Sequence, residues 1–190
     1  AHKAGTPVGG GLLIVLTTAF LFSFFLFLFV LFGQDIHTNF PSIFAEIRIL
    51  LFTFAGFALL GVYDDLSKIF FWKRKQFFGL RLRQKLILEC ALALLISFWL
   101  FHDLKINIIH IPFFGVYNIS YFYILFSTFT IVAFANAVNI TDGLDGLATG
   151  VLVITLSSFW IIASSILDVP TSLFISIWLG GLLAFLYFNI

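Results

Sequence analysis

The sequence predicts an all-α protein, a bundle of about six transmembrane helices. Of its 190 residues, 62% are hydrophobic and 10% are charged, and the mean hydropathy is +1.14. Soluble domains are about half apolar and about one quarter charged, so the composition excludes that class. An apolar run of about 20 residues is long enough to cross a bilayer as a helix. Such runs cover residues 11–32, 43–63, 85–101, 121–138, 149–167 and 173–189.

The organisation that these runs imply is a single transmembrane domain over residues 1–190. Six apolar runs are more than a signal peptide explains, and the sequence shows neither an internal repeat nor a linker. The one cysteine, Cys90, lies inside the third run, so a disulfide framework is excluded. Between the third and fourth runs, residues 102–120 contain Pro112, Gly115 and alternating apolar residues. This pattern predicts a short hairpin on the membrane surface.

The basic residues predict the orientation, because Lys and Arg concentrate in cytoplasmic connections. The chain before residue 11 and the connections 64–84 and 139–148 fall on one side of the membrane. That side holds eight of the ten basic residues. They are Lys3, Lys68, Lys73, Arg74, Lys75, Arg81, Arg83 and Lys85. The opposite connections hold Lys105, with Arg48 just inside the following run. We therefore predict that the chain before residue 11 and the connections 64–84 and 139–148 are cytoplasmic.

The first polar segment on the predicted cytoplasmic side precedes the first run. Thr6 suits a helix N-cap, and Pro7 suits the first helical position. A helix N-terminus with glycines around it binds phosphate readily, and Lys3 adds a cation. An ordinary helix start explains the same residues, and for this segment alone it is the simpler explanation.

The second polar segment is the acid pair Asp64-Asp65, which closes the second run. Because this run passes from outside to inside, we expect the acids at or beyond the C-terminal end of its helix. The partial negative charge there repels carboxylates, which also repel each other. Lys68 could compensate, and Mg²⁺ is the stronger candidate because it favours carboxylate oxygens together with substrate phosphates. A solvated helix end is the alternative.

The third polar segment follows the fourth run. Asn136 and Asn139 are three residues apart, as are Asp142 and Asp145, so each pair shares a face if the segment is helical. It is not an EF-hand, because the closing Glu is absent. Turn chemistry explains Asn, Asp and Gly in a loop, but not two asparagines at a membrane edge, where polar side chains are costly and usually functional.

The three segments in this order resemble one family. The patterns are K-x-G-T-P-x-G-G at 3–10, G-x-x-D-D-x-x-K at 61–68 and N-A-V-N-x-T-D-G-L-D-G-L-A at 136–148. Together they closely resemble the polyprenyl-phosphate N-acetylhexosamine-1-phosphate transferases, the glycosyltransferase 4 family. The resemblance covers essentially the whole chain, and the third pattern is highly specific.

Within that family, the forms Gly5-Thr6-Pro7 and Thr141–Asp145 favour the branch that transfers phospho-MurNAc-pentapeptide over the branch that transfers GlcNAc-1-phosphate. One departure is that Gly9-Gly10-Gly11 follows Val8, where this branch usually reads Thr-Met-Gly-Gly. Family members have about ten helices long enough to cross a bilayer. We therefore expect this chain, which contains no methionine, to be an incomplete piece without the first helix and without everything after Phe188-Asn189. The expected missing part includes a third essential aspartate and a histidine-rich loop, so activity of the piece alone is in doubt.

By resemblance, the protein would act at the cytoplasmic face of the bacterial inner membrane, in peptidoglycan biosynthesis. It would transfer phospho-MurNAc-pentapeptide from UDP to undecaprenyl phosphate, giving lipid I and UMP, with Mg²⁺ as cofactor. Asp64 and Asp65 would be the catalytic and metal-binding pair, one contacting the lipid phosphate and the other ligating Mg²⁺, in an order left open. The substrate-binding residues would be Lys3, Thr6, Asn136, Asn139, Asp142, Asp145 and Asn189. The partners would be both substrates and membrane lipid, with no nucleic acid, and a homodimer is left open.

Three other interpretations stay open. A GlcNAc-1-phosphate transferase of the same family differs only in its donor. An ion-coupled transporter is the alternative from another class, and it would place its acids near the middle of the bilayer. Glu89 is the only acid well inside a run, near its predicted cytoplasmic quarter, and snorkelling or helix pairing explains it. A non-catalytic remnant is the third.

Overall fold

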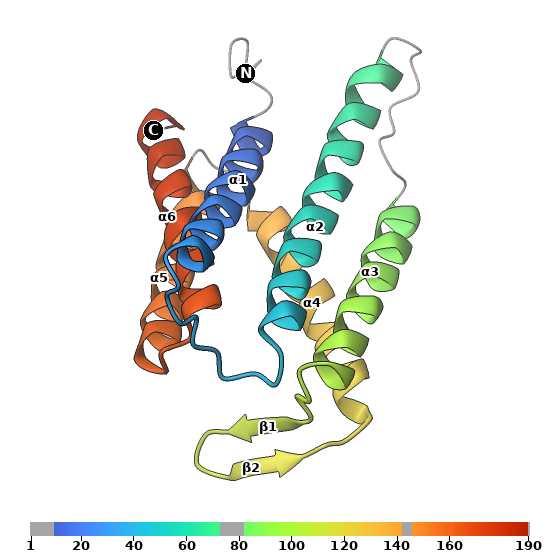
Figure 1. The fold of residues 1–190 in the computed structure, drawn as a ribbon. Helices are drawn as coiled ribbons and strands as arrows, with labels where there is room; N and C mark the ends of the chain where they lie inside the picture. The colour runs from blue at the N-terminus through green and yellow to red at the C-terminus, as the bar shows by residue number, and fades with distance from the viewer. Residues whose placement is uncertain (1–9, 73–81, 142–145, 190) are drawn as a thin grey trace. The chain divides into compact units, whose positions relative to one another are not determined.

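The protein is described by a computed structural model covering residues 10–72, 82–141 and 146–189 (Figure 1). These residues form six α-helices and a two-stranded sheet. The elements are α1 (Gly10–Leu31), α2 (Ile43–Trp72), α3 (Leu82–His102), β1 (Ile108–Ile111), β2 (Gly115–Asn118), α4 (Phe122–Thr141), α5 (Leu147–Ser165) and α6 (Val169–Asn189). All six helices are long and apolar enough to cross a membrane. The predicted all-α class and its six runs are confirmed.

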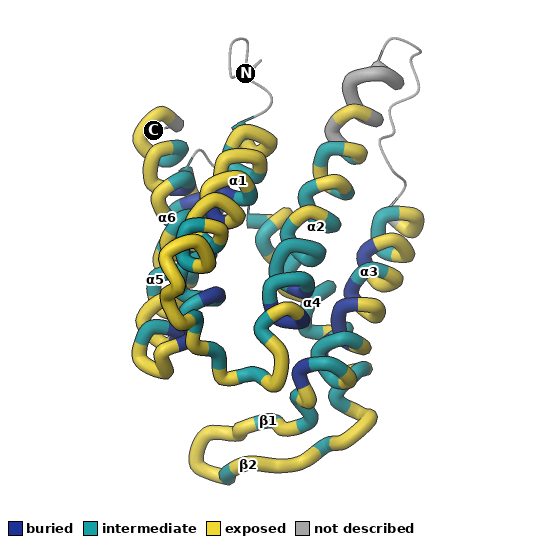
Figure 2. The backbone as a smooth tube through the Cα atoms, viewed as in Figure 1, coloured by how far each residue is buried: buried dark blue, intermediate teal, exposed yellow. Residues whose placement is uncertain are grey.

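Many large apolar residues in the described part of the chain are exposed, and Figure 2 shows exposed residues along the helices. On α1, Phe20 is 69% exposed and Phe27 61% exposed, whereas Phe22 is fully buried. An apolar surface of this extent marks contact with a partner or a membrane. Because the helices also have the length that a bilayer requires, the protein is an integral membrane protein.

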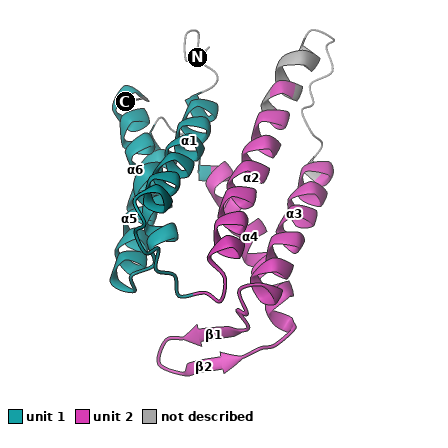
Figure 3. Cartoon of the chain, in the orientation of Figure 1, with its two compact units in different colours: residues 1–39, 141–190 teal, residues 40–140 magenta. Residues whose placement is uncertain are grey.

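The chain divides into two compact units (Figure 3). Unit 1 comprises residues 1–39 and 141–190, and unit 2 comprises residues 40–140. In unit 1, α6 packs against both α1 and α5. Phe22 meets Phe174 edge to face, with ring centroids 5.3 Å apart. A Cβ atom on Gly181 would lie 3.3 Å from the Ile14 side chain, so this glycine permits the close approach of α1 and α6 that small residues provide in membranes.

Helix α6 begins four residues before the predicted run. Asp168 is 2% exposed and accepts a hydrogen bond at Oδ1 from the backbone N–H of Thr171, at 3.2 Å. This is the capping contact that an aspartate makes at a helix start. Pro170 is also compatible with a first helical turn. Hydropathy placed the start of this helix too late because Asp168 and Pro170 are typical of a connection.

In unit 2, α2 packs against α3, and a small core lies between them. Its buried members are Ala45, Ile49, Ile96 and Leu104. Strands β1 and β2 pair antiparallel, with Ile108 opposite Asn118 and Ile111 opposite Gly115. The predicted hairpin is therefore confirmed. Its turn needs a positive φ of 106° at Gly115, which a glycine adopts without strain.

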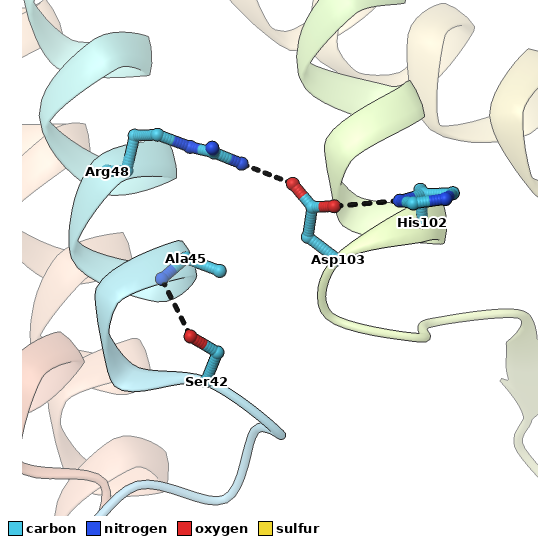
Figure 4. Close-up of polar contacts among 5 residues, drawn as sticks. All are labelled: Ser42, Ala45, Arg48, His102 and Asp103. Atoms are coloured by element: carbon cyan, nitrogen blue, oxygen red, sulfur yellow. Dashed lines mark hydrogen bonds and ion pairs between the residues drawn. The ribbon is translucent and has the colours of Figure 1, made fainter.

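A polar cluster joins α2 to the end of α3 on the hairpin side of unit 2 (Figure 4). We call Arg48, His102 and Asp103 the Asp103 cluster. Arg48 donates to Asp103 Oδ2, and the other oxygen, Oδ1, lies 2.8 Å from Nδ1 of His102. The Arg48 guanidinium also lies over the Trp99 ring, 4.7 Å from its centroid. Nearby, Ser42 caps α2 by accepting the backbone N–H of Ala45 at 3.3 Å.

Candidate active site

Asp64 and Asp65 lie inside α2, and this overturns one part of the prediction. The helix continues to Trp72, so the acids are about two turns before its C-terminal end. The helix dipole acts mainly within the last turn, and the predicted repulsion between that end and the carboxylates is therefore wrong. Residues 64–72, predicted as a connection, are helical. The side chain of Asp64 is half-buried, and that of Asp65 lies outside the described part of the structure.

The predicted site residues of unit 2 that the structure describes lie toward the end away from the hairpin. Helices α2 and α3 run in opposite directions, and they touch where a Cβ atom on Gly56 would lie 3.0 Å from the Leu92 methyl groups. Asp64 is eight residues after Gly56, about 12 Å along α2. Lys85 is seven residues before Leu92, about 10 Å in the same direction along α3. Figure 1 shows that the end of α2 and the start of α3 lie on the same side of unit 2.

The most buried polar contact at this end joins α3 to α4. We call Lys85, Glu89 and Asn136 the Glu89 cluster. Glu89 is 4% exposed, and its Oε2 accepts a hydrogen bond from Asn136 Nδ2 at 2.6 Å. Its other oxygen, Oε1, lies 3.9 Å from the Lys85 ammonium group, one turn earlier on α3. Of the two earlier explanations for Glu89, helix pairing is confirmed.

Asn136 and Asn139 have different surroundings although both lie on α4. Asn136 is half-buried against α3, and its Nδ2 also donates to the Val132 carbonyl at 2.9 Å. Asn139 is exposed, about one turn closer to the C-terminal end of α4. The structure therefore brings Asn136, Asn139 and Asp64 to one end of unit 2, with Asn136 alone bonded to Glu89.

In unit 1, the start of α1 lies beside the end of α6. A Cβ atom on Gly10 would lie 2.5 Å from the Phe185 ring, so these two helix ends are adjacent. Asn189 follows Phe185 by four residues and is the last residue of α6. Gly146 precedes α5 with a φ of 77°, a left-handed conformation that favours glycine. Several predicted residues lie outside the described part of the chain, namely Lys3, Thr6, Asp142 and Asp145, as does the side chain of Asn189.

The sequence does not predict the Glu89 cluster as a unit. The basic-residue pattern assigns Lys85 to the topology of the chain, and snorkelling or helix pairing explains Glu89. A signal was present, because Lys85 and Glu89 are four residues apart and therefore neighbours on a helix. Nothing in the sequence indicated that Asn136, 47 residues later, is the third member. Among the described residues, no group of three or more His, Cys, Asp or Glu is placed to hold a metal ion.

Comparisons with known proteins agree with the family resemblance. The chain is 39% identical over 188 residues to the phospho-N-acetylmuramoyl-pentapeptide-transferase of Caldanaerobacter subterraneus subsp. tengcongensis, covering 98% of this chain and 54% of the relative. Proteins of the same name are 37% identical in Streptococcus pneumoniae and 35% identical in Listeria welshimeri, covering 98% of this chain and 52% and 54% of those relatives. The chain thus spans about half the length of the curated relatives it matches. The sequence profile described as Glycosyl transferase family 4 matches residues 47–190, and the chain belongs to this family.

Proposed function

We propose that this chain is part of a phosphoglycosyl transferase that transfers phospho-MurNAc-pentapeptide from its UDP-linked donor to undecaprenyl phosphate. The products are lipid I and UMP, and the reaction takes place at the cytoplasmic face of the bacterial inner membrane. The observation that carries this proposal is the 35–39% identity, over nearly the whole chain, to proteins named phospho-N-acetylmuramoyl-pentapeptide-transferase. The remaining half of such a protein would complete the site.

The position of the polar residues supports a transferase over a transporter. Asp64, Lys85 and Asn136 lie toward one end of unit 2, where a water-soluble nucleotide-sugar and a lipid phosphate can meet. A transport path places its acids near the middle of the bilayer. Glu89 lies further inside its candidate span than Asp64, and it is bonded to Asn136 and lies beside Lys85.

Asp64 and Asp65 suit Mg²⁺ because carboxylates are hard oxygen ligands, and this ion is usually held by one or two of them together with substrate phosphates. Adjacent positions of an α-helix are rotated by about 100°. This favours separate roles, in which one aspartate ligates Mg²⁺ and the other contacts the attacking lipid phosphate and accepts its proton. When bound, Mg²⁺ would neutralise charge that develops between the two phosphates.

The other motif residues are proposed to bind the donor. Asn136 and Asn139, followed by Asp142 and Asp145, offer amide and carboxylate groups to the uridine and the sugar, and Asn189 joins them. Lys3 and Thr6 would lie at the rim. Two phosphates held in line by such contacts react faster because both orientation and proximity are already established.

The test uses the full-length enzyme in detergent, with labelled UDP-MurNAc-pentapeptide and undecaprenyl phosphate. We expect a lipid-linked product and one UMP per turnover, lost when the divalent metal is chelated and restored by Mg²⁺. UDP-GlcNAc is the matched donor. A product from UDP-GlcNAc alone would assign the enzyme to the other branch of the family. No product from either donor, with ion flux in proteoliposomes, would support the transporter.

A further inference from the structure

We propose that Glu89 is a positioning residue, which orients the side-chain amide of Asn136 and presents its carbonyl oxygen Oδ1 to the nucleotide-sugar donor. The inference rests on the proposed function, because Asn136 belongs to the motif assigned there to donor binding. It adds a residue on α3 that lies outside all three motifs.

The contacts of Asn136 select one orientation of its amide. Nδ2 carries two hydrogens. It donates to Glu89 Oε2 at 2.6 Å and to the Val132 carbonyl at 2.9 Å. An ionised carboxylate and a backbone carbonyl only accept hydrogen bonds, so a flipped amide would place Oδ1 against two acceptor oxygens. The orientation is therefore set by the protein, and Oδ1 is the atom that neither hydrogen bond uses.

Glu89 is itself held in place from two sides. It is 4% exposed, and a buried carboxylate is stable only when it is paired and hydrogen-bonded. Lys85, on the preceding turn of α3, lies beside Oε1, and Asn136 takes Oε2. The two carboxylate oxygens thus have different partners, and this fixes the rotation of the carboxylate. Glu89 on α3 therefore holds the Asn136 amide in its orientation.

A fixed acceptor oxygen determines which ligand groups fit. Oδ1 would receive an N–H or O–H group, and UDP-sugars carry such groups on the uracil ring, on the sugar and on its acetamide. A ligand that presents an acceptor there leaves two oxygens unpaired, and an unpaired polar group in a binding site strongly disfavours the wrong ligand. Glu89 therefore contributes to donor specificity through Asn136 without touching the ligand.

The experiment compares three variants of the full-length enzyme with a control. Glu89→Ala removes the acceptor, and Glu89→Gln keeps an oxygen that can receive Asn136 Nδ2. The control is Phe101→Leu. Phe101, on α3, contacts Tyr121 just before α4, with ring centroids 5.1 Å apart, so the control weakens contact between the same two segments without reaching Asn136. The third variant, Asn136→Ala, tests the motif residue itself.

We expect Glu89→Ala to raise the Kd for UDP-MurNAc-pentapeptide about tenfold, the effect of one lost, well-oriented hydrogen bond. The KM for undecaprenyl phosphate should stay close to that of the wild type. Glu89→Gln should bind the donor within about threefold of the wild type, because one acceptor oxygen remains. Phe101→Leu should lower Tm and leave the donor Kd unchanged. Should Glu89→Ala not fold, Glu89→Met, which fills a similar volume without an acceptor, replaces it.

Two outcomes would overturn the positioning role. In the first, Glu89→Ala binds the donor normally while Asn136→Ala does not, so that donor binding by the motif stands and Glu89 has no part in it. In the second, donor affinity falls in Glu89→Ala and Phe101→Leu alike, in proportion to Tm, and Glu89 only holds α3 and α4 together. Normal donor binding in Asn136→Ala would instead contradict the donor assignment of the motif, on which both proposals depend.

Discussion

Unit 2 has a polar cluster between its helices at each end, and the two clusters differ in burial. In the Glu89 cluster, the side chains of Lys85 and Glu89 are 21% and 6% exposed. In the Asp103 cluster, those of Arg48 and Asp103 are 39% and 24% exposed. Removing one partner of a buried charge pair lowers the stability of the folded protein, whereas an exposed ion pair contributes little to that stability. The comparison therefore predicts that the Glu89 end tolerates change poorly and that the Asp103 end tolerates it well.

The two ends also differ in sequence context. The Glu89 cluster includes Asn136 of the third motif and lies at the same end of unit 2 as Asp64. The Asp103 cluster lies beside the hairpin, and its residues belong to none of the three motifs. We infer that the first end serves binding and chemistry and that the second only fastens α2 to α3.

The largest expected effect is an all-or-none difference in thiol labelling. The experiment tests on which side of the membrane each end of unit 2 lies. In a Cys90→Ala background, which removes the native, exposed thiol, Ser67→Cys is introduced beyond Asp64. His110→Cys, at an exposed position of β1, is the matched variant at the hairpin end. An impermeant thiol reagent applied to spheroplasts should label only His110→Cys. Ser67→Cys should react only after the membrane is opened. Labelling of Ser67→Cys from outside would invert the topology and remove the proposed cytoplasmic site.

The next effect compares the same substitution at both ends. Asp64→Asn in the full-length enzyme should lower turnover about a hundredfold or more, because a positioned charge at a phosphoryl-transfer site is lost. Asp103→Asn should leave turnover within about twofold, as expected for a partly exposed ion pair at the opposite end of unit 2. Formation of the lipid-linked product measures both. Equal losses of turnover in the two variants would contradict the inference that one end serves catalysis and the other only holds α2 and α3 together.

A smaller effect concerns stability. Glu89→Ala leaves a half-buried amide N–H and a mostly buried ammonium group without their partner, and should lower the free energy of unfolding by about 1–3 kcal/mol. Asp103→Ala should lower it by about 0–1 kcal/mol, because its pair is more exposed. Thermal melting in the same detergent compares them. If Asp103→Ala melts at the lower temperature, burial does not govern the difference between the clusters.

The smallest effect is a dependence on pH at the Asp103 end. The hydrogen bond from His102 is the main cause that holds the pKa of Asp103 below its ordinary value of 3.8; partial burial opposes it, and Arg48 adds to the lowering. Because the folded pKa is lower than the unfolded one, the stabilisation is fully present above about pH 4 and is lost as pH falls through the folded value. Melting curves from neutral pH downward should show a decline in the wild type that is smaller in Asp103→Asn. Identical declines would mean that other carboxylates cause it.

Much of the candidate site could be predicted from residues that are close in sequence. The motif around Asn136 and the acid pair at Asp64 were found because each is contiguous and lies next to an apolar run. Hydropathy likewise placed the six helices and the hairpin, because apolar length and alternation are local properties. The error at α2 has the same origin, since hydropathy marks where a helix leaves the membrane and not where it ends. The helix therefore continues to Trp72.

Short contiguous patterns in the sequence were enough to predict the family, the helical class and the motif residues. Which polar groups are partners became known from the three-dimensional structure. Glu89 bonds to Asn136 across 47 residues, and Arg48 bonds to Asp103 across 55. Each pair forms because two helices meet with a particular rotation and register, and these depend on side-chain packing along both helices. No local sequence pattern encodes the rotation and register of two helices. The hydrogen bond from Asn136 to Glu89 could therefore not be predicted from the sequence.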